Sequence, residues 1–111
     1  MPITQKLISA YKLWHVYWSH FDKALRYGLG SRIDALFIVA IENIFAASYR
    51  SPEQKSSYLK RASSALDVLK FLLQVAWEIK TLDNKKYIAL SAKLNEIGRM
   101  LGGWQKKTAT P

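Results

Sequence analysis

An apolar repeat interrupted by glycines lies near the C-terminus, in the sequence Leu94-Asn95-Glu96-Ile97-Gly98-Arg99-Met100-Leu101-Gly102-Gly103-Trp104-Gln105-Lys106. Large apolar side chains recur there every three or four residues, and they continue a repeat that begins upstream, at Tyr87, Leu90, Leu94, Ile97, Leu101 and Trp104. This spacing predicts one buried face of a helix over residues 83–105, with Asp83 as its cap. Gly98 falls inside that helix, where glycine costs about 1 kcal/mol relative to alanine. We interpret Gly98 as a point where a neighbouring helix approaches closely.

Three earlier segments show the same period and predict helices over residues 3–21, 30–49 and 52–81. Their expected buried faces are Ile3, Leu7, Tyr11, Trp14, Trp18 and Phe21; Ile33, Phe37, Ala40, Ile44 and Ala47; and Leu59, Ala62, Leu66, Leu69, Leu73, Ala76 and Ile79. Residues 22–29 contain charges and breakers and are expected to form a long connection. Ser51 and Pro52 fit the start of the third helix.

The two remaining connections are short, which favours antiparallel neighbours. The sequence therefore predicts an all-α, antiparallel up-down-up-down four-helix bundle that forms a single domain over residues 1–111. Residues 106–111 are expected to be a frayed tail.

The third predicted helix carries a second apolar stripe, offset from its buried face. The residues of this stripe are Val68, Phe71, Leu72 and Val75. An isolated bundle needs only one apolar face on each helix, so we expect the second stripe to form a subunit interface.

Positive charge is the strongest compositional signal. The chain has 17 Lys and Arg against 8 Asp and Glu, a formal charge of +9 over 111 residues. Such an excess on one small domain favours a polyanion partner, although simple solubility is the alternative. The candidate nucleic-acid-binding residues form four groups: Lys23, Arg26 and Arg32; Lys55, Lys60 and Arg61; Lys85 and Lys86; and Lys106 and Lys107. Tyr27, Tyr58, Tyr87 and Trp104 lie among them and are either base-stacking groups or half-buried bundle residues.

Groups for catalysis or metal binding do not converge in the sequence. There is no cysteine, and His15 and His20 would point about 140° apart on a helix. Gly28-Leu29-Gly30-Ser31 lacks the lysine of a phosphate-binding loop, and no strand precedes it. We therefore expect no enzymatic activity, metal or cofactor. The N-terminus lacks signal-peptide features and no apolar run reaches the ~18–20 residues of a membrane span, so a cytoplasmic protein without a membrane partner is expected.

Two motifs together resemble a known family. They are Tyr27-Gly28-Leu29-Gly30-Ser31-Arg32-Ile33-Asp34 and Ile97-Gly98-Arg99-Met100-Leu101-Gly102-Gly103-Trp104. The chain resembles the accessory variability proteins (Avd) of diversity-generating retroelements, over roughly residues 3–107. This family lies within the small four-helix-bundle proteins that include the 23S ribosomal-RNA intervening-sequence proteins.

The resemblance implies a ring-shaped homo-oligomer, typically a pentamer, with a basic outer surface. It also implies a non-catalytic accessory factor that binds a reverse transcriptase, template RNA and possibly DNA, and that supports mutagenic copying of RNA into complementary DNA. Arg32 and Arg99 would then bind phosphate or pair with Asp34 and Glu96. The alternative is an RNA-associated protein of the intervening-sequence type with no polymerase partner. The segment Ala40-Ile41-Glu42-Asn43-Ile44-Phe45 departs from that type and favours the retroelement branch.

Overall fold

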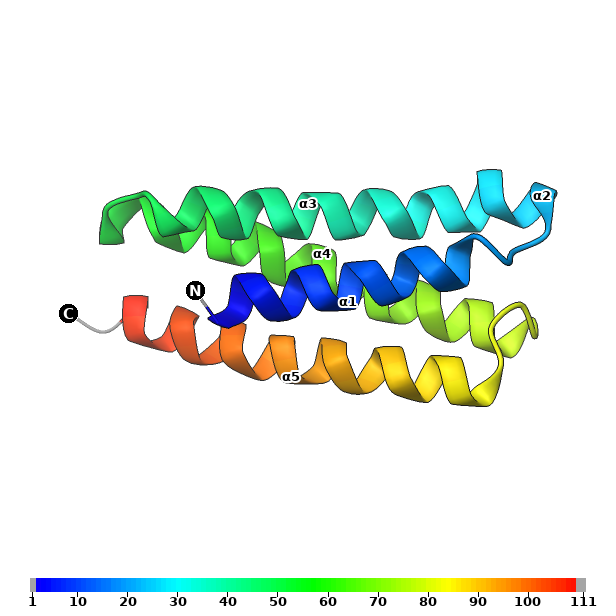
Figure 1. Cartoon of the computed structure of the whole chain (residues 1–111). Helices are drawn as coiled ribbons and strands as arrows, with labels where there is room; N and C mark the ends of the chain where they lie inside the picture. Colours follow the sequence, from blue (N-terminus) through cyan, green and yellow to red (C-terminus); the bar gives the residue numbers. More distant parts are fainter. Residues whose placement is uncertain (1, 110–111) are drawn as a thin grey trace.

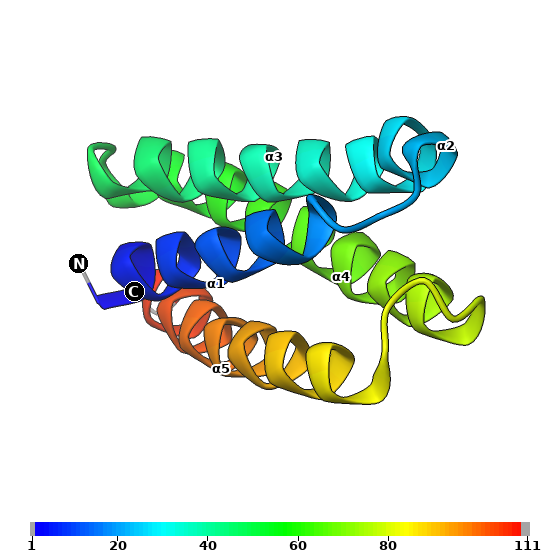
Figure 2. The same cartoon turned by 45° about the vertical axis from the view of Figure 1, so that its right-hand side comes forward.

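Four antiparallel helices make up the fold of the computed structural model, which describes residues 2–109 (Figure 1). They are α1 (Pro2–Trp18), α3 (Ser31–Ser48), α4 (Pro52–Glu78) and α5 (Asn84–Ala109). A short helix, α2 (Lys23–Leu25), and a π-helical turn, η1 (Arg26–Gly30), lead directly into α3. Helix α1 packs between α3 and α5, and α4 contacts the same two helices (Figure 2). The predicted all-α four-helix bundle is confirmed.

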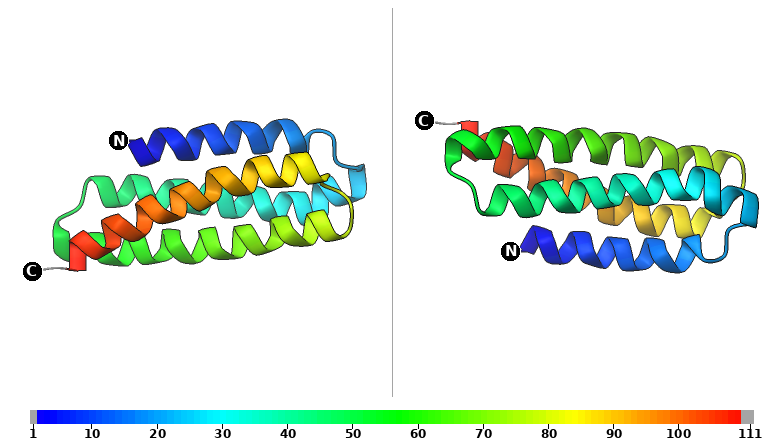
Figure 3. Two further views of the ribbon diagram at one scale, coloured as in Figure 1. Left: turned by 90° about the horizontal axis from the view of Figure 1, so that it is seen from below. Right: turned by 90° about the horizontal axis from the view of Figure 1, so that it is seen from above.

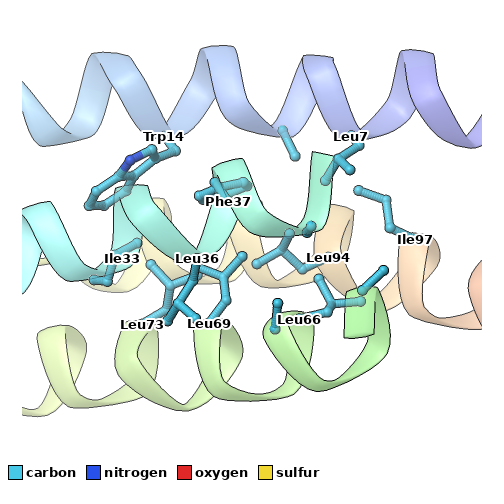
Figure 4. Close-up of a cluster of buried hydrophobic side chains, with 14 of the residues drawn as sticks. Leu7, Trp14, Ile33, Leu36, Phe37, Leu66, Leu69, Leu73, Leu94 and Ile97 are labelled. Carbon is cyan, nitrogen blue, oxygen red and sulfur yellow. The ribbon is translucent and has the colours of Figure 1, made fainter. Parts of the chain in front are cut away.

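The core lies along the middle of the bundle and receives side chains from every long helix (Figure 4). Trp14 and Phe37 are its largest members, and the leucine faces of α4 and α5 fill the remaining space. Almost every residue of the predicted buried faces is buried or packs against the core. Ile79 is the exception, because it is 52% exposed.

The turn after α4 explains this error. Helix α4 ends at Glu78, and Lys80 has a positive φ of 65°. The Lys80 N–H donates to the Trp77 carbonyl at 3.0 Å, and the Thr81 N–H donates to the Ala76 carbonyl at 2.9 Å. These two bonds form a Schellman motif, which reverses the chain just after Ile79. Leu82, which the periodic pattern did not include, returns to the core and is only 1% exposed.

The long first connection was predicted wrongly. Helix α1 ends at Trp18 rather than near residue 21, and helical structure resumes at Lys23. Residues 19–22 alone make the turn, and Phe21 is buried although it lies outside both helices. The Gly28-Leu29-Gly30 segment is therefore part of a helical segment and is not a flexible entry to it.

Gly30 allows a close contact between α1 and η1. In the π-helical turn the Arg26 carbonyl accepts hydrogen bonds from Trp18 Nε1 at 2.9 Å and Ser31 Oγ at 3.1 Å. A Cβ on Gly30 would lie 2.6 Å from Trp18 Cδ1, closer than real Cβ atoms approach, and closer still to Trp18 Nε1. By contrast, a Cβ on Gly98 would make ordinary contacts, 3.6 Å from Lys70 Nζ. The close approach predicted at Gly98 is wrong, and Gly30 holds that role.

The ends of α5 differ in how well they were predicted. Asp83 caps the helix as expected, because its Oδ1 accepts the Lys86 N–H at 2.9 Å. The expected frayed tail is wrong over residues 106–109, where α5 continues to Ala109, and residues 110 and 111 lie outside the described part.

The bundle has two distinct ends (Figure 3). The terminal end holds the start of α1, the α3–α4 turn and the end of α5. The double-turn end holds the turns at residues 19–22 and 79–83.

Candidate nucleic-acid interface

The four predicted basic groups divide evenly between the two ends of the bundle. Lys55, Lys60 and Arg61 on α4 and Lys106 and Lys107 on α5 lie toward the terminal end. Lys23, Arg26, Arg32, Lys85 and Lys86 lie toward the double-turn end. The longest dimension of the molecule is 47 Å, so the two sets are separate surfaces rather than one patch.

At the terminal end, cationic side chains lie over aromatic rings. The guanidinium groups of Arg50 and Arg61 lie 5.2 and 5.4 Å from the ring centroid of Tyr58. The Lys55 ammonium lies 5.8 Å from the Trp104 ring. Such cation–π contacts limit side-chain freedom without neutralising the charge, so these groups stay available to an anion. Arg50 was not among the predicted cationic residues, and its position in the α3–α4 turn brings it to this cluster.

Two carboxylates, Glu53 on α4 and Glu96 on α5, are held in the charged form because hydrogen bonds lower the pKa of each. Glu96 forms an ion pair with Lys6 at 2.7 Å, and this hydrogen bond and charge lower the pKa of Glu96. The pKa of Glu53 is lowered by hydrogen bonds from its own backbone and from Ser51. Of the two alternatives for Arg99, phosphate binding or a pair with Glu96, the direct pair is not formed: the ion-pair partner of Glu96 is Lys6, which joins α1 to α5.

The double-turn end also combines lysines with ordered aromatic rings. Lys86 lies 5.5 Å from the ring centroid of Tyr17, and burial, together with the charge of Asp83, raises the pKa of Tyr17. Trp77 and Tyr87 stack with centroids 5.0 Å apart. Trp77 Nε1 also donates to Asn84 Oδ1 at 2.6 Å, which holds the indole in place. Trp77 was not among the aromatic residues expected at this surface, because its spacing gave no sign that it would lie beside the α4–α5 turn.

Arg26 differs from the other candidate residues. It is half-buried, and its Nη2 donates to the Phe21 carbonyl at 3.3 Å. Its Nε is buried without a hydrogen-bond partner. These contacts tie η1 to the first turn, so Arg26 has a structural role and leaves Lys23 and Arg32 as the exposed cations of that group.

The histidines make local contacts within or next to α1. His15 packs on Tyr11 and Trp18, and His20 Nδ1 lies 2.9 Å from the Val16 carbonyl. Among the described residues, no three His, Cys, Asp or Glu side chains are placed to hold a metal ion.

Asp34 joins α3 to α1 rather than pairing with Arg32. Asp34 Oδ1 accepts a hydrogen bond from Trp14 Nε1 at 3.3 Å. Burial of Tyr11, together with a hydrogen bond to Asp34 and the negative charge of Asp34, raises the pKa of Tyr11 to about 12.

The predicted interface stripe is partly open to solvent. Val68 and Phe71 are 45% and 61% exposed, whereas Leu72 and Val75 are half-buried. Val68 also lines an open groove of about 880 Å³ between α3 and α4, whose apolar floor includes Leu36 and Val39. The stripe therefore belongs to a wider apolar surface that sequence periodicity alone did not show.

A second exposed apolar surface lies on the other side of α3. Phe45 and Tyr49 are exposed, and their rings pack together at 4.9 Å. This surface was absent from the predicted interface, although Phe45 lies on the helix face opposite the α3 core residues and Tyr49 directly follows the same helix.

The whole arrangement thus comprises an apolar core, two cationic ends and exposed apolar flanks. A family model described as bAvd-like matches residues 1–108, which is nearly the entire chain. The chain belongs to the bAvd-like family. The match confirms the resemblance to the Avd-type accessory variability proteins that the two glycine-containing motifs indicated.

No curated protein matches the bAvd-like chain. Across the described residues, none of the helices has both the length and the apolar character that a membrane span requires.

Proposed function

We propose that this bAvd-like protein is a non-catalytic accessory factor of a diversity-generating retroelement. In this role it binds the reverse transcriptase of the element together with template RNA, and it supports mutagenic synthesis of complementary DNA. Membership of the bAvd-like family supports the accessory part of this proposal, because Avd-type proteins are accessory proteins. The observation that carries the nucleic-acid part is the placement of lysine ammonium groups beside aromatic rings at both ends of the bundle.

The physical reason is that phosphate contacts supply affinity and aromatic rings supply base contacts. A protein with +9 formal charge releases counterions when it binds a nucleic acid, so affinity falls steeply as salt rises. Exposed apolar side chains on α4, such as Val68 and Phe71, and on α3, such as Phe45, offer contacts of another kind to protein chains, both further copies of this chain and the reverse transcriptase. One molecule is thereby able to contact RNA and protein with different surfaces.

Retention of the reverse transcriptase tests this function. The tagged protein is co-expressed with the reverse transcriptase encoded beside it and washed at about 0.5 M salt, where purely electrostatic association is largely screened. We expect the enzyme to remain bound, because apolar contacts persist under these conditions. Loss of the enzyme at this salt, with RNA still bound at low salt, would contradict the polymerase partnership and leave RNA binding intact.

We also propose that the protein assembles into a homo-oligomeric ring, as members of this family type do, with five subunits as the expected number. A closed ring needs two different surfaces on every protomer. Two exposed apolar surfaces meet this need, because they lie on different helices. One is the stripe on α4 that includes Val68 and Phe71, and the other is formed by Phe45 and Tyr49 at the end of α3. Burying them removes large apolar side chains from water, which favours association.

Phe71→Glu is expected to convert the assembly to monomers. The substitution places a charge at the centre of the proposed interface, where it would be desolvated without a partner. Light scattering coupled to size-exclusion chromatography measures the mass, and helical circular dichroism reports the fold. Ile88→Glu is the matched control, because Ile88 is 66% exposed and lies on α5, a helix that carries neither surface. An unchanged mass for Phe71→Glu would place the interface elsewhere.

A further inference from the structure

Two adjacent glycines near the end of α5 have no evident role within the protomer. Glycine destabilises a helix interior relative to alanine, yet Gly102 and Gly103 both lie inside α5. A Cβ added at either position would meet no atom within 4 Å. Packing within the protomer therefore does not require glycine at either place, in contrast to Gly30.

Gly103 lines a pocket at the terminal end, between the start of α1 and the end of α5. The pocket has a volume of about 470 Å³, and its walls are Pro2, Ile3, Met100, Gly103, Trp104 and Lys107. This volume lies within the range of sites that hold small organic groups, roughly 300–1,000 Å³. The absence of a side chain at Gly103 keeps this wall of the pocket open.

The residues around the pocket combine an aromatic ring with positive charge. Trp104 packs against the core and is half-buried, so its indole is held in a defined orientation. The Lys55 ammonium lies over the same ring at 5.8 Å, and Lys107 belongs to the pocket wall. Glu96, the carboxylate of α5, is paired with Lys6. The chemistry of the site thus suits a flat apolar ring that carries a negative charge beside it.

We propose that this pocket binds the base of an unpaired nucleotide, with Trp104 as the stacking surface and Lys55 and Lys107 contacting the adjoining phosphates. The proposal rests on the proposed nucleic-acid binding and adds that the terminal end selects single strands. In a duplex the bases are stacked on one another and are not available to a pocket, whereas an unpaired base stacks on an aromatic side chain whatever its identity. An apolar side chain from a protein partner would fill the pocket, but it would leave Lys55 and Lys107 without a negative charge to contact.

Filling the pocket at Gly103 tests the proposal. Fluorescence anisotropy measures the affinity of the wild-type protein, Gly103→Leu and Gly102→Leu for a labelled, unstructured RNA of about 12 nucleotides, within the usual size of single-strand sites. The same sequence as an RNA duplex is measured in parallel at about 0.1 M salt. Gly102 is a matched control, because it has equally open surroundings but does not line the pocket. Both variants replace a helix-destabilising glycine, and circular dichroism checks that they fold.

We expect Gly103→Leu to weaken single-strand binding about tenfold or more, because one stacked base is lost, while duplex binding stays the same. Gly102→Leu should bind both nucleic acids as the wild type does. The slope of affinity against salt should be unchanged in both variants, since no charge is removed.

Each of the other outcomes would contradict a different part of the proposals on RNA binding, the pocket and its selectivity. Wild-type protein that binds neither RNA at low salt would refute the proposed nucleic-acid function and the pocket together. Wild-type binding with no difference between the two leucine variants would refute the pocket alone. Equal weakening of single strand and duplex by Gly103→Leu would show that the site is not selective for unpaired bases. Unchanged RNA affinity with weaker retention of the reverse transcriptase would assign the pocket to a protein side chain.

Discussion

Gly30→Ala is expected to lower the free energy of unfolding by about 2–3 kcal/mol and the melting temperature by about 10 °C. The added Cβ would lie 2.6 Å from Trp18 Cδ1 and 3.1 Å from the Leu25 carbonyl oxygen, so the indole has to move. Moving it breaks the 2.9 Å bond from Trp18 Nε1 to the Arg26 carbonyl and disturbs the stack of Trp18 on Trp14. The better helix propensity of alanine, worth about 1 kcal/mol, offsets only part of this loss.

Gly28→Ala is the matched control for this prediction. Gly28 lies in the same π-helical turn, and a Cβ there would meet no atom within 4 Å. This variant should therefore be as stable as the wild type or up to about 1 kcal/mol more stable. Thermal melting at one fixed protomer concentration measures both variants, because assembly makes the melting temperature concentration-dependent. Equal stability of the two variants would show that the contact between Trp18 and Gly30 does not constrain the fold.

Neutralising Lys85, Lys86, Lys106 and Lys107 together with glutamine is expected to weaken single-stranded RNA binding about 100- to 1,000-fold at about 0.1 M salt. Each phosphate contact on a single strand contributes about 0.7 to the slope of log affinity against log salt, so four contacts contribute about 3. The bundle should survive, because none of the four side chains belongs to the core. Anisotropy titrations over a range of salt concentrations give both the affinity and the slope.

Variants with two substitutions locate the effect. Lys85 with Lys86 tests the double-turn end, Lys106 with Lys107 tests the terminal end, and Lys12 with Lys93 serves as the control on the sides of α1 and α5. Each pair lowers the formal charge from +9 to +7, so net charge is matched across the three. If the control pair weakens binding as much as the end pairs do, net charge rather than the two ends determines affinity, and the proposed interface is wrong.

Much of the fold followed from periodicity alone. Apolar residues three and four apart in each segment identified four helices and almost the whole core, from Leu7 and Trp14 to Leu94 and Leu101. The reason is that helix spacing and burial are linked locally: one face of a helix has to leave water, and the sequence shows which. The cap at Asp83 was predictable for the same reason, since its bond to the Lys86 N–H spans only three residues. The glycine-containing motifs also carried the family resemblance, which the family match confirms.

Only the tertiary structure decided which residues meet across the bundle. The sequence could not show that Gly30, and not Gly98, faces a neighbouring ring, because that contact joins α1 to a π-helical turn. Nor could it show that Lys6 rather than Arg99 pairs with Glu96, or that Arg26 reaches back to the Phe21 carbonyl.

The same holds for the surfaces that we assign to function. Lys55 reaches Trp104, and Pro2 and Ile3 share a pocket with Gly103, only because distant segments end at the same end of the bundle. The sequence by itself thus determined the helices, the charge and the family. The positions of those charges relative to aromatic rings and pockets depend on packing between residues far apart in the chain, and local patterns contain no information on such distances.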